Sequence, residues 1–108
     1  MAKFEIKDGV ATIPEGTTEI ETFAFNQCTS LKSVVIPKGV TVIEEFAFMD
    51  CTSLTTVTLP AGVEDIDAAA FTGCSALATI FVPAGEADYY KERLNRRRLR
   101  DIIVELEK

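Results

Sequence analysis

A 23-residue unit is repeated three times in succession, and this period constrains the fold more than any other feature of the chain. The tetrapeptide Ile-Pro-x-Gly starts at residue 13, returns at 36 and, with Leu or Val in place of Ile, returns at 59 and 82. Five apolar columns recur in each unit, and in the first unit they are Ile20, Ala24, Phe25, Cys28 and Leu31. Such a period predicts a solenoid, in which each unit buries its face only against its neighbours.

Each unit contains two stretches that favour extended chain. The stretches 31–36, 54–59 and 77–82 alternate apolar and polar residues and stop at a proline, so we expect them to stack as a parallel sheet. The stretches 17–20, 40–43 and 63–66 follow a Pro-x-Gly turn and are expected on the opposite side. A single helical or 3₁₀ turn is expected over 23–25, 46–48 and 69–71.

The two ends of the chain depart from the period. Residues 4–13 predict a β-hairpin, because Asp8-Gly9 is a two-residue turn signal flanked by alternating residues. After Gly85, acids come first and bases later, which predicts a helix of about fifteen residues from Glu86. Residues 101–106 either continue that helix or form a short strand.

Length and period together predict a single domain over 1–108. Its expected parts are an N-terminal cap hairpin (1–12), full repeats (13–35, 36–58 and 59–81), and a partial repeat with a C-terminal cap helix and tail (82–108). Caps are expected because the entropy cost of ordering a few uncapped repeats is at least as large as the gain from their burial.

Charge is divided unevenly along the chain. Residues 1–85 carry four Lys and eleven Asp or Glu (−7), whereas residues 86–108 carry seven Lys or Arg and six acids (+1). The repeat body is therefore not expected to bind nucleic acid or an anionic membrane. Only the basic segment 91–100 could make phosphate contacts. We instead expect its bases to pair with acids of the last repeat, and a nucleic-acid binder remains the alternative.

Several classes of function lack the residues that they need. There is no histidine, which removes histidine-based catalysis and most metal chemistry. No nucleophile–base pair, phosphate loop or metal quartet is present, so the sequence predicts a protein that is not an enzyme. No apolar run is long enough to span a bilayer. The first residues lack the apolar stretch of a secretory signal, which indicates either a cytosolic protein or one whose leader is absent here.

The unit carried by residues 36–58, I-P-x-G-V-x-x-I-x-x-x-A-F-x-x-C-x-S-L-x-x-V-x, resembles the BspA-type leucine-rich repeat, a bacterial class with 23-residue units. The resemblance implies an α/β fold, namely a short right-handed leucine-rich-repeat solenoid with a stacked parallel sheet, a hairpin cap and a helical cap. It also implies a surface-displayed or secreted binding module, often adhesive, with no catalytic residues or cofactor to carry over.

Two columns of the repeat are candidates for chemistry and have plainer structural explanations. Successive cysteines are 23 residues apart, so they are expected to form a ladder across the repeats. Such a ladder does not supply the tetrahedral ligand set of a metal site. The Cβ atoms of stacked cysteines do not point toward each other, which disfavours disulfides. We expect all of them to be buried in a core ladder. The ladder comprises Cys28, Cys51, Cys74, Phe25, Phe48 and Phe71. Glu21, Glu44 and Asp67 form an acidic column that could collect Ca²⁺, but it lacks the loop spacing of a tight calcium site and we expect a solvated edge instead.

The outward side of the strands is the expected recognition surface, because stacked sheets of this kind commonly serve as binding faces. Short hydroxyl side chains with a few apolar ones make it flat and mostly uncharged, although Thr is also simply a good strand former. The predicted face comprises Ser33, Val35, Thr56, Thr58, Thr79, Phe81 and Tyr89. The expected function is a non-enzymatic module for protein or glycan partners. The alternative is a self-assembling structural protein, and the sequence leaves monomer and homo-oligomer open.

Overall fold

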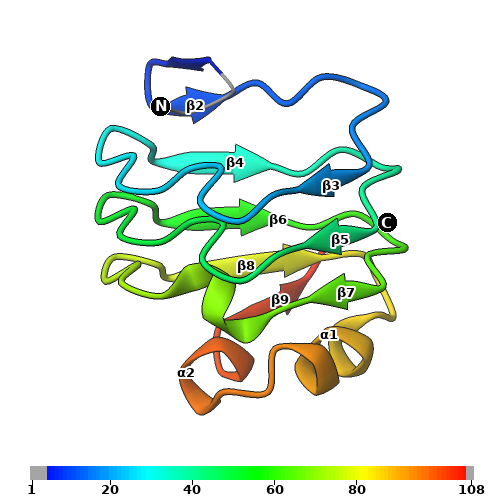
Figure 1. The fold of residues 1–108 in the computed structure, drawn as a ribbon. Coiled ribbons are helices and arrows are strands. Elements are labelled where there is room, and N and C mark those ends of the chain that lie inside the picture. The colour runs from blue at the N-terminus through cyan, green and yellow to red at the C-terminus, as the bar shows by residue number, and fades with distance from the viewer. Residues whose placement is uncertain (1–4, 107–108) are drawn as a thin grey trace.

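Two sheets form from the two extended stretches of each repeat (Figure 1). The computed structural model describes residues 5–106. The larger sheet has the order β1-β2-β4-β6-β8-β9, and the smaller one has the order β3-β5-β7. The larger sheet contains β1 (Ile6–Lys7), β2 (Val10–Ala11), β4 (Ser33–Val35), β6 (Thr56–Thr58), β8 (Thr79–Val82) and β9 (Ile103–Glu105). The smaller sheet contains β3 (Glu19–Ile20), β5 (Val42–Ile43) and β7 (Asp65–Ile66).

The 23-residue period sets the register of both sheets. Val34 pairs with Val57, which pairs with Ile80, and the steps continue to Ile103 in β9. Ile20, Ile43 and Ile66 are aligned in the smaller sheet in the same way. Apart from the antiparallel β1–β2 pair, the strand pairs are parallel. The period therefore places equivalent side chains side by side.

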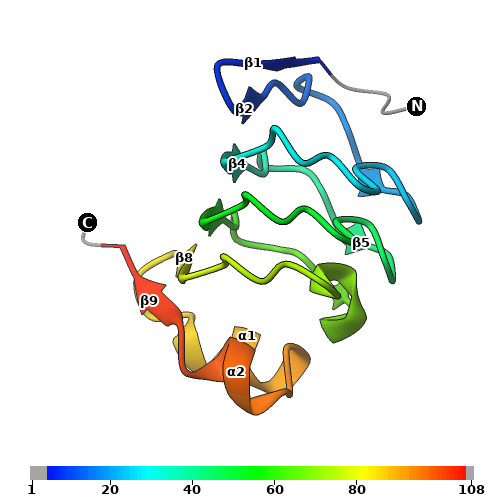
Figure 2. The ribbon, with the colours of Figure 1, turned by 90° about the vertical axis from the view of Figure 1, so that its left-hand side faces the viewer.

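The core lies between the two sheets (Figure 2). Its centre is a stack of phenylalanine rings, with centroids 5.0 Å apart for Phe25 and Phe48 and 5.5 Å apart for Phe48 and Phe71. Both ring pairs are within 10° of parallel. Near-parallel rings at this separation add to the stabilisation from burial. Among the described residues, no charged side chain is buried in this core.

The turn before each cysteine differs between repeats. Phe23 and Phe46 have φ values of 62° and 60°, in the left-handed region that non-glycine residues adopt at a cost. In the third repeat Ala69 takes that column, and the turn becomes a 3₁₀ helix, η1 (Ala68–Phe71), capped by the Asp67 side chain. Loss of the aromatic residue thus coincides with relief of the left-handed conformation.

The predicted hairpin is present at the N-terminal edge of the larger sheet. Asp8 and Gly9 both have positive φ, 53° and 82°, as a type I′ turn requires. Gly9 also accepts backbone hydrogen bonds from Lys32 and Ser33 at 2.7 and 3.1 Å, which join the hairpin to the first repeat. Residues 1–4 of the predicted N-terminal cap (1–12) and residues 107–108 of the predicted C-terminal part (82–108) lie outside the described residues.

The prediction of one fifteen-residue helix after Gly85 is wrong. The chain forms two short helices, α1 (Ala87–Arg93) and α2 (Arg97–Arg100), and then turns back into β9. The break follows Leu94, whose φ and ψ of −97° and 59° are not helical, and Arg96 is extended. A continuous helix would carry the chain past the end of the stack. The break lets Leu94 and Leu99 both bury there, at 0% and 4% exposure.

The described chain is therefore a mixed α/β structure with a parallel sheet and two short helices at one end (Figure 2). No helix of residues 5–106 has the length and apolar character needed to cross a bilayer.

Candidate interaction face

Two rows of side chains run across the outer face of the larger sheet. One row aligns Val10, Ser33, Thr56 and Thr79, and the other aligns Val35, Thr58, Phe81 and Val104. Val34, Val57 and Ile80 alternate with them and are buried, so the rows face away from the core. Six of the seven predicted face residues thus lie side by side on one surface.

This face is apolar at its edges and hydroxylated in the middle. Val35 is 62% exposed, and Val10 and Val104 are 45% and 46% exposed. Ser33, Thr56, Thr58, Thr79 and Phe81 are half-buried. None of the residues in the two rows is charged. Removing water from a flat, uncharged and partly apolar surface costs little free energy, which favours contact with another macromolecule.

Tyr89 does not belong to this face. It lies in α1, and its hydroxyl donates to the Val63 carbonyl at 2.9 Å, just before β7 of the smaller sheet. Its ring makes an edge contact with Tyr90, and the Arg93 guanidinium carbon lies 3.6 Å from its ring centroid. Tyr89 is close to Phe81 in sequence, but the chain turns after Gly85 and places α1 against the end of the last repeat. Tyr89 therefore lies away from the outer face of the strands.

Val104 is a face residue that the sequence analysis missed. It pairs with Phe81 through the parallel β8–β9 ladder and is 46% exposed. The signal was available, because residue 104 lies 23 positions after Phe81 and Ile103 lies 23 after Ile80. The period therefore extends one strand further than the Pro-x-Gly marks suggest.

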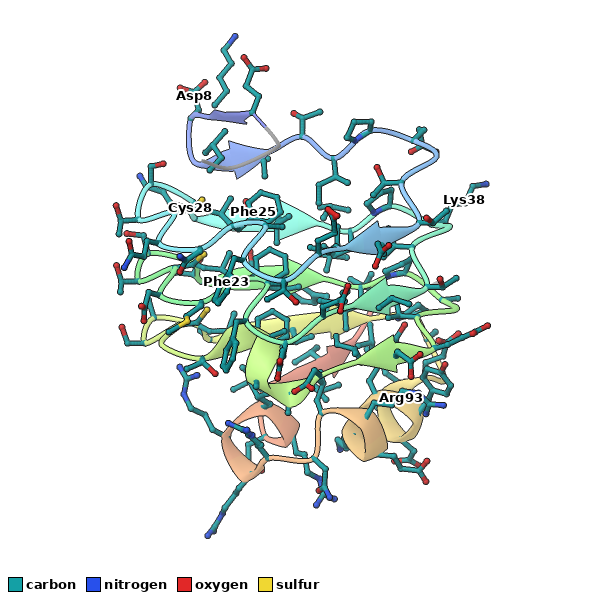
Figure 3. The ribbon with its side chains drawn as sticks, in the orientation of Figure 1. Asp8, Phe23, Phe25, Cys28, Lys38 and Arg93 are labelled. Atoms are coloured by element: carbon teal, nitrogen blue, oxygen red, sulfur yellow. The ribbon has the colours of Figure 1, made fainter. Side chains whose placement is uncertain are left out.

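Within residues 5–106, the basic segment forms no ion pair with an acid of the last repeat, in contrast to the prediction. Two of its arginines bond backbone carbonyls instead. Arg98 donates to the carbonyls of Cys74 and Leu77 at 3.0 Å and to that of Ser75 at 3.4 Å. Arg93 donates to the Glu64 and Tyr89 carbonyls and lies at the α1 end of the stack (Figure 3). The Glu64 carbonyl is the equivalent of the Thr41 carbonyl, which accepts from backbone N–H groups of the next repeat, so at this position the Arg93 side chain takes the place of another repeat.

The three cysteines are not equivalent. Cys51 and Cys74 are buried, and their thiols donate to the Phe25 and Phe48 carbonyls of the preceding repeat, each at 3.0 Å. The neighbouring Cys74 thiol, together with burial, raises the pKa of Cys51. The prediction that all three are buried is wrong for Cys28, which is only partly covered because no full repeat precedes it (Figure 3).

The acidic column lies on the smaller sheet, on the side of the stack away from the interaction face. A hydrogen bond with Glu19, together with burial and the charges of Glu19, Glu21 and Glu45, raises the pKa of Glu44. A shallow hollow of about 410 Å³ lies along this column, lined in part by Glu44, Asp65 and Asp67. Over residues 5–106, no group of three acidic or cysteine side chains is arranged to hold a metal ion.

Comparison with known proteins gives two findings. The family model for the BspA-type leucine-rich repeat region matches residues 6–106, with six copies of the repeat. A crystal structure of a leucine-rich cell surface protein from Faecalibacterium prausnitzii is similar in fold, with a TM-score of 0.65 and 33% sequence identity. The match covers 73% of this chain and 21% of that chain, so this chain corresponds to about a fifth of the surface protein. No curated protein sequence matches.

Proposed function

The chain belongs to the BspA-type leucine-rich repeat family, and from this premise we propose that it is a non-enzymatic binding module whose outer sheet face meets a partner protein. The observation that carries the proposal is the uncharged face made by the two rows, with Val35 and Val104 exposed beside Phe81. Aromatic and aliphatic anchors on a flat rigid sheet are typical of protein recognition. Display on a cell surface is supported by the similarity to the leucine-rich cell surface protein.

We also propose the parts that make up this module. Residues 1–12 are an N-terminal hairpin cap, 13–35, 36–58 and 59–81 are full repeats, and 82–108 are a partial repeat with a helical cap and tail. Together they form one short solenoid domain. The hairpin bonds to the first repeat and the side chains of the α1–α2 region bond to the last one, which supports a capping role for both ends.

The proposal is tested by adding charge to the face without disturbing the core. Val35→Glu changes an exposed side chain, so we expect the free energy of unfolding to move by less than about 0.5 kcal/mol. Binding should be screened against purified extracellular proteins and an array of immobilised glycans, with the wild-type protein and with Val35→Glu and Phe81→Glu variants. Partners of the wild type should lose at least about tenfold in affinity for both variants.

Phe23→Glu is the matched control. Phe23 is 52% exposed, and its ring is stacked on Phe46 with centroids 5.9 Å apart, in the turns rather than on the strands. This variant should keep full affinity. A partner that tolerates both strand-face variants and is lost with Phe23→Glu would move the binding site to the turns. Capture of glycans alone would replace the protein partner with a carbohydrate.

A further inference from the structure

β9 is an open edge of the larger sheet (Figure 2). The Ile102 carbonyl accepts from Ile80 N–H at 2.9 Å, and Leu106 N–H donates to the Val82 carbonyl at 2.8 Å, so residues 102 and 106 bond toward β8. Backbone groups alternate sides along a strand, and those of Ile103 and Glu105 therefore point to the other side. Within residues 5–106, no strand lies on that side of β9.

β9 is a short strand of three residues, but its side chains lack the usual protection against pairing. Exposed sheet edges are commonly blocked by lysine, proline, a bulge or a very short strand. Residues 102–106 contain neither lysine nor proline. The carboxylate of Glu105, their one charged residue, accepts from the Ala87 N–H at 3.0 Å and is thereby held against its own helix. The opposite edge, β1, is only two residues long and carries Lys7.

The apolar pattern of the edge is complementary to itself. Ile102, Val104 and Leu106 share one side of the strand, and Val104 and Leu106 are 46% and 40% exposed. If two copies pair antiparallel with Val104 at the centre, Ile102 lies opposite Leu106 of the second copy. Ile103 then lies opposite Glu105 of the second copy, in the register where outward-pointing backbone groups exchange hydrogen bonds. One register therefore both pairs the outward backbone groups and places the apolar side chains of the two copies opposite each other.

We propose that β9 pairs edge to edge with β9 of a second copy about a two-fold axis, forming one continuous sheet across two protomers. An interface of this kind uses the same patch twice, which is the commonest arrangement in homo-oligomers. Charge supports a second copy as the occupant. Residues 1–85 carry −7 and residues 86–108 carry +1, so two copies joined at β9 meet through their least acidic ends.

The proposal is tested by sedimentation equilibrium of the intact chain at concentrations from about 10 µM to about 1 mM, the range in which a small interface associates. The wild-type mass should rise from 11.8 kDa toward twice that value. Val104→Lys places two like charges opposite each other on the axis, so this variant should stay at the monomer mass. Val35→Lys, at a more exposed valine inside the same sheet, should associate like the wild type.

A second measurement does not depend on the strength of association. Directly opposed residues in an antiparallel pair have Cβ atoms about 4.5–5.5 Å apart, within reach of a disulfide. Val104→Cys should therefore yield a covalent dimer on mild oxidation, at least about tenfold faster than Val35→Cys. The proposal is overturned if the wild type stays monomeric throughout and the two cysteine variants cross-link equally. It is also overturned if Val35→Lys abolishes association as fully as Val104→Lys, because the face and not the edge would then be the interface.

Discussion

At the N-terminal end of the larger sheet the chain is joined to the first repeat by backbone groups, whereas at the C-terminal end side chains of α1 and α2 add to the backbone ladder between β8 and β9. Gly9 accepts from two backbone N–H groups of the first repeat. At the other end, the hydroxyl of Tyr90 donates to Pro60, and Arg98 reaches three carbonyls. A hairpin can be encoded by two turn residues, but the helical end depends on individual long side chains. Substitutions at the two ends should therefore differ in size.

Tyr90→Ala should cause the largest loss. Tyr90 is fully buried, and its removal leaves both a cavity and an unpaired Pro60 carbonyl, so we expect about 3–5 kcal/mol lower stability. Tyr90→Phe, which keeps the ring, should lose about 1–2 kcal/mol. Urea unfolding followed by circular dichroism measures both. A loss below about 1 kcal/mol for Tyr90→Ala would show that the last repeat does not depend on this side chain.

Arg98→Ala should cost about 1–2 kcal/mol, because the Cys74 and Leu77 carbonyls lose a charged donor. Arg97→Ala is the matched control, since Arg97 is exposed and makes no side-chain hydrogen bond to a residue within 5–106. It should change stability by less than about 0.5 kcal/mol. Equal effects of the two substitutions, measured by urea unfolding, would mean that total charge and not carbonyl bonding holds this end.

Gly9→Ala tests the backbone-closed end and should cost about 1 kcal/mol, because alanine disfavours a φ of +82°. A Cβ on Gly9 would also meet the Lys32 side chain at 2.9 Å, but that flexible chain can move. Gly16→Ala is the control for backbone strain alone, with φ of +91° and open space around the added carbon. Both variants should be compared by thermal unfolding. If they lose the same stability, the cost comes from the positive φ alone. If Gly9→Ala loses more, the additional cost comes from the contact with the Lys32 side chain.

Glu105→Gln should give the smallest effect, and it should depend on pH. Backbone N–H groups of Ala87 and Gly85 lower the pKa of Glu105. Folding therefore favours the carboxylate, and this stabilisation is present above the ordinary pKa of about 4.3 and is lost as the pH falls through the lower folded value. The variant should be slightly less stable than the wild type at pH 7, and the gap should close in acid. If the difference in stability between the wild type and the variant persists in acid, the charge of Glu105 is not its cause.

The period was sufficient to predict the larger sheet with its register, the extended segments opposite it and the column of Phe25, Phe48 and Phe71. This success has a simple physical reason, since identical units can bury their apolar side chains only by stacking in register. The same reasoning placed six residues side by side on one surface of the larger sheet, and their role in binding stays a prediction. The reasoning missed β9. Ile103 and Val104 keep the 23-residue spacing from Ile80 and Phe81, but no Pro-x-Gly turn follows them as it follows β4, β6 and β8.

The end of the chain was harder to predict because its local signals compete. Acids before bases favour one long helix, but burial of both Leu94 and Leu99 requires a break between them. Tyr89 and Arg98 look like surface residues in the sequence. Their roles depend on backbone carbonyls that the folded last repeat places within their reach. Contacts made to an exposed end have no periodic counterpart in the sequence and follow only from three-dimensional structure.

The order of strands in the larger sheet also has a mechanical consequence. β1 and β9 are the outermost strands, and the hydrogen bonds of the sheet run from one strand to the next along the stack (Figure 1). A force that pulls these two strands apart acts along those bonds and not across them. The repeats are then loaded in series and should detach one at a time from an end, at lower force than a sheet pulled in shear. A chain built in this way would lengthen stepwise under tension.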